Sequence, residues 1–385
     1  MRILAVDMGT GTQDILLFDS AQPVENALQM IMPSATEIAA GRIRRATREG
    51  RAAVLTGVTA GGGPCAWALE AHLKAGLPAF ATPEAARTFD DDLEAVRGIG
   101  VTLVSDDEAA RTQGEHVQLR DLDLDAVRAA LQAFDVDTRF DGLALGCLDH
   151  GASPPGYSDR LFRFEHLRRV VAARNDLRAF AYLPQELPPY LTRARALMDA
   201  ADGGVPSVFL DTGPAAALGA LQDPQVAGHG ERLVVNLGNM HALAFHLRGT
   251  RIISLYEHHT GEMTSEQIVD FSRRLVGGTL AHEEVFDTKG HGVYYADAPA
   301  RPSTSSRPGE SPPATGGADD GPLVAVTGPQ RGRLRGSALA PYFAVPHGDM
   351  MVSGCYGLLW AFAEKHPRHA EEILEPLGVG TAVAG

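Results

Sequence analysis

Cysteine is scarce in this chain of 385 residues, and the cysteines that occur are far apart. There are three, Cys65, Cys147 and Cys355, each in apolar surroundings. Such spacing supplies neither a disulfide framework nor a CxxC-type metal site. The pattern fits a reducing compartment, and we therefore expect a cytoplasmic protein.

Long apolar runs are also missing, because no stretch reaches the ~20 residues that a membrane-spanning helix needs. The chain opens on a strand-like run without a basic segment and a cleavage site, so we expect no secretory signal. Positive charge is in deficit, since 34 Lys and Arg against 48 Asp and Glu give a formal net charge of −14. This balance disfavours non-specific binding to nucleic acid or to an anionic membrane, and we expect neither as a partner.

The order of expected elements indicates an α/β protein. Apolar, β-type runs at 3–7 and 14–18 flank a Gly-Thr turn, and a third strand follows at 26–34. Helical patterns then alternate with short buried strands, which is typical of α/β layers rather than of a helix bundle. The length of the chain favours two domains over one.

The opening pattern recurs in the second half. Residues 231–249, ERLVVNLGNMHALAFHLRG, again show a strand, a polar glycine turn and a strand. Two halves with one order of elements suggest duplicated domains that face each other. We expect the first domain, with insertions, at 1–205 and the second at 206–385. A segment rich in Pro, Ser and Gly at 296–322 is expected to be a disordered surface loop.

The turn of the first hairpin carries the clearest chemical signal. A hairpin that approaches a phosphate needs glycines without a Cβ, donor groups, and an acid that holds Mg²⁺ through water. Six residues within a stretch of seven supply all of these, namely Asp7, Gly9, Thr10, Gly11, Thr12 and Gln13. No Lys follows and no helix begins there, so we interpret the stretch as a strand-turn-strand cradle rather than a GxxxxGK[ST] loop.

The stretch VDMGTGTQDILLFD resembles the first phosphate motif of the actin, Hsp70 and sugar-kinase (ASKHA) clan. FLDTGPAAALGAL at 209–221 is similar to the clan's connecting helix, and LVVNLGNMHALAFHL to its second phosphate motif. GDMMVSGCYGLLWAF at 348–362 resembles its adenosine motif. The resemblance implies two ribonuclease-H-like (actin-like ATPase) domains that close over ATP and Mg²⁺ in an inter-domain nucleotide cleft. It adds nucleotide contacts at Asn236, Gly238, Asn239, Gly354 and Gly357.

More narrowly, the combination GGGP, LDHG, NLGNMHALAF, EHHTG, GHG and PHGDMM looks like a branch of this clan often labelled pyruvate formate-lyase activating enzyme. A radical activase of that kind holds an iron–sulfur cluster on three closely spaced cysteines. The chain has no such group of cysteines, so we do not expect radical chemistry.

Asp149 is the first candidate for a general base or a second metal partner beside Asp7. It follows a buried strand and precedes His150 in the expected cleft, where His150 would contact the acceptor. Asn236 stands where the clan usually has an acid, so Mg²⁺ would depend on Asp7, alone or with Asp149. The alternatives are a strand-end turn acid at 149 and asparagines that merely satisfy a turn.

Histidines beside glycine or polar turn residues are the unusual feature of the sequence. Candidate substrate contacts are His241, His258, His259, His291 and Arg331. Histidines of this kind could act as general bases or as ligands of Zn²⁺ or Fe²⁺, while a structural role is the alternative for each one. His258 and His259 would face opposite ways in a strand. For the set as a whole we expect at least two in the cleft.

The glycines at 61–63 open a helix, where free N–H groups favour an anion, and tight packing is an equal alternative. The leading hypothesis is an ATP-binding, Mg-dependent phosphotransferase or ATPase that acts on a small acceptor. The second is a nucleotide-dependent switch or activator of a partner enzyme with little turnover. The third is a histidine-based, metal-dependent hydrolase.

Overall fold

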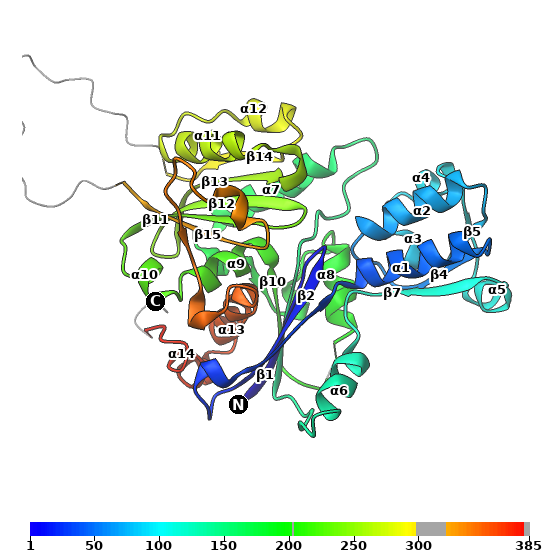
Figure 1. The fold of residues 1–385 in the computed structure, drawn as a ribbon, viewed down its shortest axis with the longest axis horizontal. Helices are drawn as coiled ribbons and strands as arrows, with labels where there is room; N and C mark the ends of the chain where they lie inside the picture. Colours follow the sequence, from blue (N-terminus) through cyan, green and yellow to red (C-terminus); the bar gives the residue numbers. More distant parts are fainter. Residues whose placement is uncertain (202–203, 298–320, 381–385) are drawn as a thin grey trace, which may run out of the picture.

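The computed structural model describes residues 1–201, 204–297 and 321–380. Three β-sheets organise the described residues. Figure 1 shows two sheets in the main body and the third in a unit that projects to one side. Most of the loop expected at 296–322 lies outside the described residues.

The first sheet belongs to the N-terminal half. Its strand order is β3 (Leu28–Pro33), β2 (Thr12–Asp19), β1 (Arg2–Met8), β8 (Gly142–Cys147), β10 (Ser207–Asp211) and β9 (Ala181–Tyr182). The three N-terminal strands pair antiparallel, whereas β1, β8 and β10 run parallel. β10 follows the boundary expected at 205/206, yet it pairs in this first sheet.

The second sheet repeats this arrangement. Its order is β14 (Gly292–Tyr295), β13 (Arg251–His259), β12 (His241–Arg248), β11 (Glu231–Leu237), β15 (Leu323–Thr327) and β16 (Tyr342–Phe343). β13, β12 and β11 pair antiparallel, and β11, β15 and β16 run parallel. The five strands from β13 to β16 therefore reproduce the order and directions of β3, β2, β1, β8 and β10. The repeat expected from the two hairpins is confirmed.

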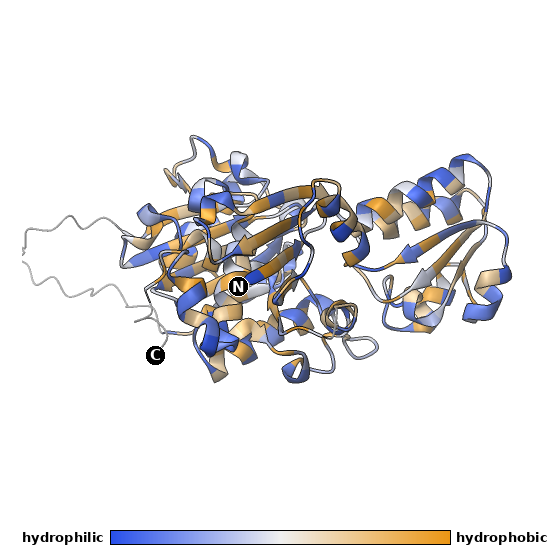
Figure 2. Cartoon of the chain, turned by 90° about the horizontal axis from the view of Figure 1, so that it is seen from below, coloured by the Kyte–Doolittle hydropathy of each residue, from blue (hydrophilic) through white to orange (hydrophobic). Residues whose placement is uncertain are grey.

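The projecting unit is an insertion between β3 and β8. Its parallel sheet has the order β6 (Val101–Leu103), β5 (Ala79–Ala81), β4 (Ala53–Gly57) and β7 (Glu115–Leu119). The helices of this unit are α1 (Ala35–Arg48), α2 (Pro64–Lys74), α3 (Pro83–Ala86), α4 (Leu93–Gly98) and α5 (Asp106–Arg111). Figure 2 shows hydrophobic strands in this unit, and Ile43, Leu55 and Val117 belong to its own buried core. The sequence predicted an α/β layer here and insertions in the first domain, but it did not indicate a separate sheet.

Two helices cross at the centre of the main body, α9 (Thr212–Ala220) and α13 (Ser353–Lys365). A Cβ on Gly219 would stand 1.7 Å from the Ser353 carbonyl oxygen, and one on Gly357 would stand 1.9 Å from that of Ala215. The small residues expected in the connecting helix therefore allow this close crossing. α13 also packs against β1, β8 and β10, so a C-terminal helix completes the core of the first half.

The other helices cover the sheets and the loops. They are α6 (Leu124–Gln132), α7 (Asp159–Ala173), α8 (Thr192–Asp199), α10 (Pro224–Ala227), α11 (Ser265–Val276), α12 (His282–Asp287) and α14 (Ala370–Leu374). Among the described helices, none combines the length and the apolar character required to cross a bilayer.

Candidate functional site

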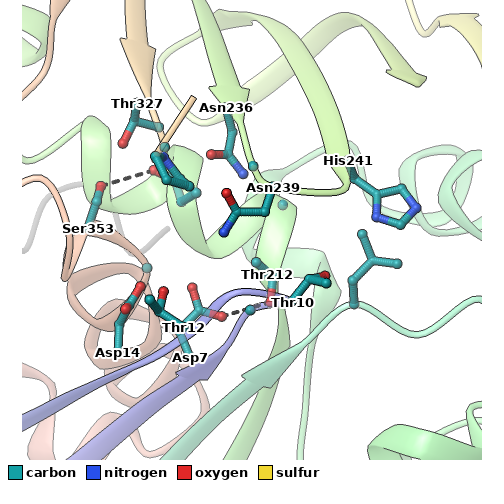
Figure 3. A pocket seen from close by; sticks show the side chains of 18 of the residues that line it. Asp7, Thr10, Thr12, Asp14, Thr212, Asn236, Asn239, His241, Thr327 and Ser353 are labelled. Atoms are coloured by element: carbon teal, nitrogen blue, oxygen red, sulfur yellow. Dashed lines mark hydrogen bonds between the residues drawn. The ribbon is translucent and has the colours of Figure 1, made fainter. Parts of the chain in front are cut away.

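The two glycine turns converge on one cavity of about 130 Å³ (Figure 3). Both turns have the same construction, because the N–H of Gly9 donates to Thr12 O and the N–H of Gly238 donates to His241 O, each at 2.9 Å. A Cβ on either glycine would stand within 3 Å of that same carbonyl oxygen. The two turns also touch each other through Gly11 and Asn239. The structure thus brings the two motifs expected to hold phosphate to one place.

Two carboxylates lie on the wall of this first cavity, Asp7 and Asp14. They form a directly opposed pair in β1 and β2, so both side chains point to the same face of the hairpin. Thr212 Oγ1 donates to Asp7 Oδ1 at 2.7 Å, while Asp14 Oδ1 is buried and has no hydrogen-bond partner. Asp14 therefore brings a free acceptor oxygen to the wall of the cavity.

Burial controls the charge of this acid pair. It raises the pKa of Asp7 to about 6, and the hydrogen bond from Thr212 offsets part of the effect. Burial also raises the pKa of Asp14 to about 7, with a further contribution from the neighbouring charge of Asp7. Asp14 was not among the site residues expected from the sequence. The register of the predicted hairpin could have revealed it, because Asp14 occupies the position opposite Asp7 across the turn.

The second half supplies the opposite wall of the first cavity. Asn236 at the end of β11 and Thr327 at the end of β15 both line it, together with Gly328. A Cβ on Gly328 would stand 2.6 Å from Asn236 Oδ1, so the loop after β15 lies directly on this side chain. Asn239 Oδ1 accepts a hydrogen bond from Gln330 Nε2 at 3.3 Å. These uncharged side chains face the two acids of the first half (Figure 3).

The residues of the motif at 348–362 lie in two places: some line the first cavity, and others lie where α13 crosses α9. Ser353 and Gly354 line the cavity, and a Cβ on Gly354 would stand 1.9 Å from Asp7 Oδ2. Gly357 lies one turn further on and does not line it. Its missing side chain is explained by the approach of α13 to α9, so the predicted nucleotide contact at Gly357 has a packing explanation instead.

Two other residues expected at the site face elsewhere. Gln13 Nε2 donates to Pro33 O at 2.9 Å on the neighbouring strand. Arg331 Nη1 donates to Gly328 O at 3.4 Å and so holds its own loop. Neither residue lines the first cavity.

A second cavity of about 320 Å³ adjoins the first. The two cavities share five lining residues, Thr10, Leu148, Arg193, Met240 and His241. The second cavity also reaches the glycines at 61–63 of the projecting unit, where the N–H of Gly61 donates to Asp121 Oδ1 at 3.1 Å. All three parts of the molecule therefore meet at this cavity.

Asp149 lines the second cavity and not the first. It is 4% exposed, and burial raises its pKa. Its Oδ1 accepts the N–H of Gly151 at 2.8 Å, and its Oδ2 accepts the N–H of Ala194 in α8 at 2.9 Å. Both oxygens thus fasten the loop after β8 to α8, and the expected role as base or metal partner stays a prediction.

Four histidines meet beside the second cavity, and we call them the four-histidine cluster: His150, His241, His259 and His291. One ring nitrogen of each lies within 4.8 Å of the others. His150 follows β8, His241 and His259 are paired residues of β12 and β13, and His291 precedes β14. The expectation of at least two histidines in the cleft is confirmed, because three of the four line the second cavity.

Burial lowers the pKa of His241 and of His291 well below the usual value, and it also lowers the pKa of His259. These rings are therefore neutral near pH 7, which is the form that acts as a metal ligand. His258 faces the other side of the sheet, as expected. Its ring nitrogens lie 3.0 Å from His259 O and 3.2 Å from Thr288 Oγ1.

A buried ion network ties the two halves together close to the cluster. Arg163 of α7 is 0% exposed and donates to Asp211 in β10 and to Glu257 in β13. Asp211 Oδ1 also accepts the N–H of Gly213 at 3.1 Å and caps α9. Asp211 thus serves both as the N-terminal cap of α9 and as an ion-pair partner of Arg163.

The sequence matches a family model described as "Putative pyruvate format-lyase activating enzyme" (DUF1786) over residues 60–307, which is more than half of the chain. The chain belongs to the DUF1786 family. The narrower resemblance expected from the sequence is thereby confirmed, although the family description does not fit the cysteines. Cys65, Cys147 and Cys355 are buried and unpaired, and the metal-ligand cluster found among the described residues consists of histidines alone. No curated protein matches this DUF1786 chain.

Several solved structures are similar to this DUF1786 chain at a low level. A ROK hexokinase from Thermus thermophilus is 13% identical over 66% of this chain and 48% of its own, with a TM-score of 0.26. The ethanolamine utilization protein EutJ from Carboxydothermus hydrogenoformans is 13% identical over 94% and 89%, with a TM-score of 0.29. The PPX-GPPA enzyme of Aquifex aeolicus is 10% identical over 85% and 68%, with a TM-score of 0.23.

The chain spans about half the length of the hexokinase and 37% of the length of a ROK family transcriptional regulator. The strand order repeated in the two sheets supports the predicted likeness to the actin, Hsp70 and sugar-kinase clan.

Proposed function

We propose that the two sheet-bearing halves are ribonuclease-H-like domains that bind ATP with Mg²⁺ between them, and that the protein is a phosphotransferase or ATPase of the actin-like clan. The observation that carries the proposal is the convergence of two equally built glycine turns on a buried acid pair. Backbone N–H groups and hydroxyls in glycine turns are suited to phosphate oxygens.

The residues present fit a hydrated Mg²⁺. Asp7 and Asp14 are the two carboxylates among the described residues that line the first cavity, and Asp14 Oδ1 lacks a partner. Mg²⁺ prefers oxygen ligands, keeps several waters and is bound through one or two carboxylates plus phosphate. The ion would neutralise charge on the phosphates, while Thr10, Thr12 and Asn239 would position them.

Nucleotide entry requires the two halves to separate. The first cavity measures about 130 Å³, whereas cavities for small ligands usually measure ~300–1,000 Å³. The crossing of α9 and α13 is the central contact between the halves and lies at the back of the cavity, because Gly213, Ala216 and Gly354 belong to its lining. We infer that the structure represents a closed arrangement of the halves.

The second cavity supports transfer to a small acceptor rather than hydrolysis alone. It is separate from the first cavity and shares five lining residues with it, so an acceptor there would lie beside the terminal phosphate. The start of α2 at the glycines at 61–63 faces this space and favours a negatively charged group. Effective transfer then depends chiefly on positioning and on charge stabilisation.

A second candidate, a nucleotide-dependent switch with little turnover, is favoured by two observations. Asn236 supplies no charge on the second half, and both oxygens of Asp149 are occupied by backbone N–H groups. Under this candidate, ATP holds the halves together and a partner enzyme binds that state.

One experiment separates these candidates from a histidine-based hydrolase. The purified protein is incubated with ATP and Mg²⁺, while ADP formation, the melting temperature and the radius of gyration are measured. ADP formation that a small metabolite stimulates supports the phosphotransferase, and thermal stabilisation with compaction but no ADP supports the switch. Absence of any change with nucleotide refutes both and leaves the hydrolase.

A further inference from the structure

We propose that the four-histidine cluster binds one late first-row transition-metal ion, with Zn²⁺ as the leading candidate, and that this ion ties the two halves of the molecule together. His150 comes from the first half, whereas His241, His259 and His291 come from the second. The proposal does not depend on nucleotide binding, because imidazole nitrogens suit Zn²⁺, Cu²⁺, Fe²⁺ or Ni²⁺ whereas Mg²⁺ selects oxygen ligands.

The ring nitrogens of the four histidines lie only slightly further apart than the ligands of a bound metal ion would. A small movement of the rings toward one another would complete the site. Four ligands at ~2.0–2.1 Å from a tetrahedral ion lie about 3.4 Å apart. The Nε2 atoms of His150 and His241 are 3.1 Å apart, and one ring nitrogen of each histidine lies within 4.8 Å of the others. The centroids of the closest pair of rings, His259 and His291, are 4.7 Å apart.

Two of the rings are oriented by partners on their other nitrogen. His150 Nδ1 lies 3.2 Å from Asp159 Oδ2, and His259 Nδ1 lies 2.9 Å from Lys289 O. In each ring the Nδ1–H therefore donates outward and the Nε2 lone pair is left for the centre of the cluster. Histidines that ligate metals almost always donate their second N–H to a carboxylate or to a backbone carbonyl.

His291 supplies the observation that points most directly to a ligand. It is 0% exposed, and neither ring nitrogen has a hydrogen-bond partner. Leaving a polar group buried without a partner costs roughly 1–3 kcal/mol, and a bound metal ion would supply the missing partner. The backbone of His291 is held in place, because its N–H donates to Glu257 O at 2.9 Å.

The chain around His291 is built for close approach. A Cβ on Gly290 would stand 2.4 Å from the His258 ring, and one on Gly292 would stand 2.3 Å from the His282 ring. Gly290 thus lets this segment lie against β13, which brings His291 to His259, while Gly292 lets it lie against α12. A merely structural histidine would not need an unpartnered ring at this position.

A metal ion bound by the four-histidine cluster would link the two halves beside the proposed phosphate site. His241 lines both cavities, so the ion would lie at their junction. Four protein ligands close the coordination sphere, as in structural zinc sites. Metal binding should therefore stabilise the closed arrangement of the halves.

The test is a Co²⁺ titration of the full chain after removal of metal with a chelator, in the absence of nucleotide. We expect one Co²⁺ per chain with the intense visible absorption of tetrahedral cobalt, displacement by Zn²⁺, and a higher melting temperature with either ion. His291→Ala and His259→Ala should each weaken binding by more than the roughly 10–100-fold that loss of an outer partner costs. His258→Ala is the matched control, because His258 is a neighbouring buried histidine outside the cluster, and it should bind like the wild type.

Circular dichroism of the metal-free variants checks folding. If His291→Ala does not fold, His259→Ala decides, because His259 is only partly buried. Absence of stoichiometric binding by the wild type would overturn the proposal, as would wild-type affinity in every folded cluster variant. Either result leaves the proposed nucleotide site untouched, since that site is tested with ATP and Mg²⁺.

Discussion

Gly11 and Asn239 bring the two hairpin turns into contact, since a Cβ on Gly11 would stand 2.4 Å from the side-chain nitrogen of Asn239. Gly11 lies in the turn between β1 and β2 of the first sheet, and Asn239 lies in the turn between β11 and β12 of the second. The two turns therefore form a single surface only while the halves are closed. This relationship makes the site dependent on the arrangement of the whole molecule.

Substitution of Gly11 by Ala should weaken binding of ATP with Mg²⁺ by roughly tenfold, equivalent to about 1.4 kcal/mol. The added methyl group pushes the Asn239 side chain away and keeps the turns apart. Stability should change little, because the neighbour is the flexible end of a side chain. Isothermal titration calorimetry measures the affinity. Because Asn239 is itself proposed to position the phosphates, Gly11→Ala is also made in the Asn239→Gly background, where it should cost little further affinity. An equal further loss of affinity in that background would contradict the explanation.

Asp14→Asn should stabilise the protein at pH 8 in the absence of Mg²⁺. The pKa of Asp14 is raised to about 7 in the folded protein, so between pH 4 and pH 7 the folded state holds a proton that the unfolded state has lost. Stability of the wild type therefore falls as pH rises through this window. The variant lacks that loss, which amounts to about 1.4 kcal/mol per unit of pKa shift.

Urea unfolding at pH 8 and at pH 4.5 measures the effect of Asp14→Asn. The stability advantage of the variant should be largest at pH 8 and should nearly vanish at pH 4.5. Addition of Mg²⁺ and ATP at pH 8 should stabilise the wild type more than the variant. A variant less stable than the wild type at pH 8 without ligand would show that the Asp14 carboxylate is satisfied in the folded protein.

Gly357→Ala should lower the free energy of unfolding by several kcal/mol, because the new methyl group would meet the backbone of α9 at Ala215. Overpacking of a tight core typically costs ~1–3 kcal/mol, and the backbone here cannot move aside like a side chain. Gly41→Ala is the matched control in α1, where no atom lies within 4 Å of the added Cβ. It should stabilise the protein by ~0.5–1 kcal/mol. Equal effects of the two substitutions in chemical denaturation would disprove the close crossing.

Asp149→Asn should lower stability by about 1–3 kcal/mol, because an amide can accept only one of the two buried N–H groups that the carboxylate accepts. ATP affinity should be unchanged, since Asp149 does not line the first cavity. Measurement of melting temperature and ADP formation in parallel separates the two roles of this residue. Loss of turnover at unchanged stability would instead support the role as general base.

Local sequence signals predicted much of the fold. The Gly-Thr turn, the repeated hairpin and the small residues of α9 are features of neighbouring residues, and each appears in the structure where it was expected. The separate sheet of the projecting unit was not expected, because a short buried strand such as β4 has the same pattern whichever sheet it joins. Which sheet such a strand joins depends on pairing with strands that are distant in the sequence.

The site was predictable to the extent that its residues stand in turns. Asp7 and Gly9 were found from the acid and the glycine turn at a strand end, and Asn236 and Gly238 through the resemblance to the clan's second phosphate motif. Asp14 was missed because it lies inside a strand, where only the hairpin register reveals its position opposite Asp7. The convergence of four histidines could not be derived, because their contacts join loops and strands from both halves.

Hydrogen–deuterium exchange with and without Mg²⁺ and ATP tests the central claim most directly, because it reports on both hairpin turns in one experiment. Slower exchange at residues 9–13 and at 236–241 together, reproduced by Mg²⁺ and inorganic triphosphate, is the result predicted for two turns that hold one polyphosphate. Protection of one turn alone, or of neither at saturating nucleotide, would contradict the account.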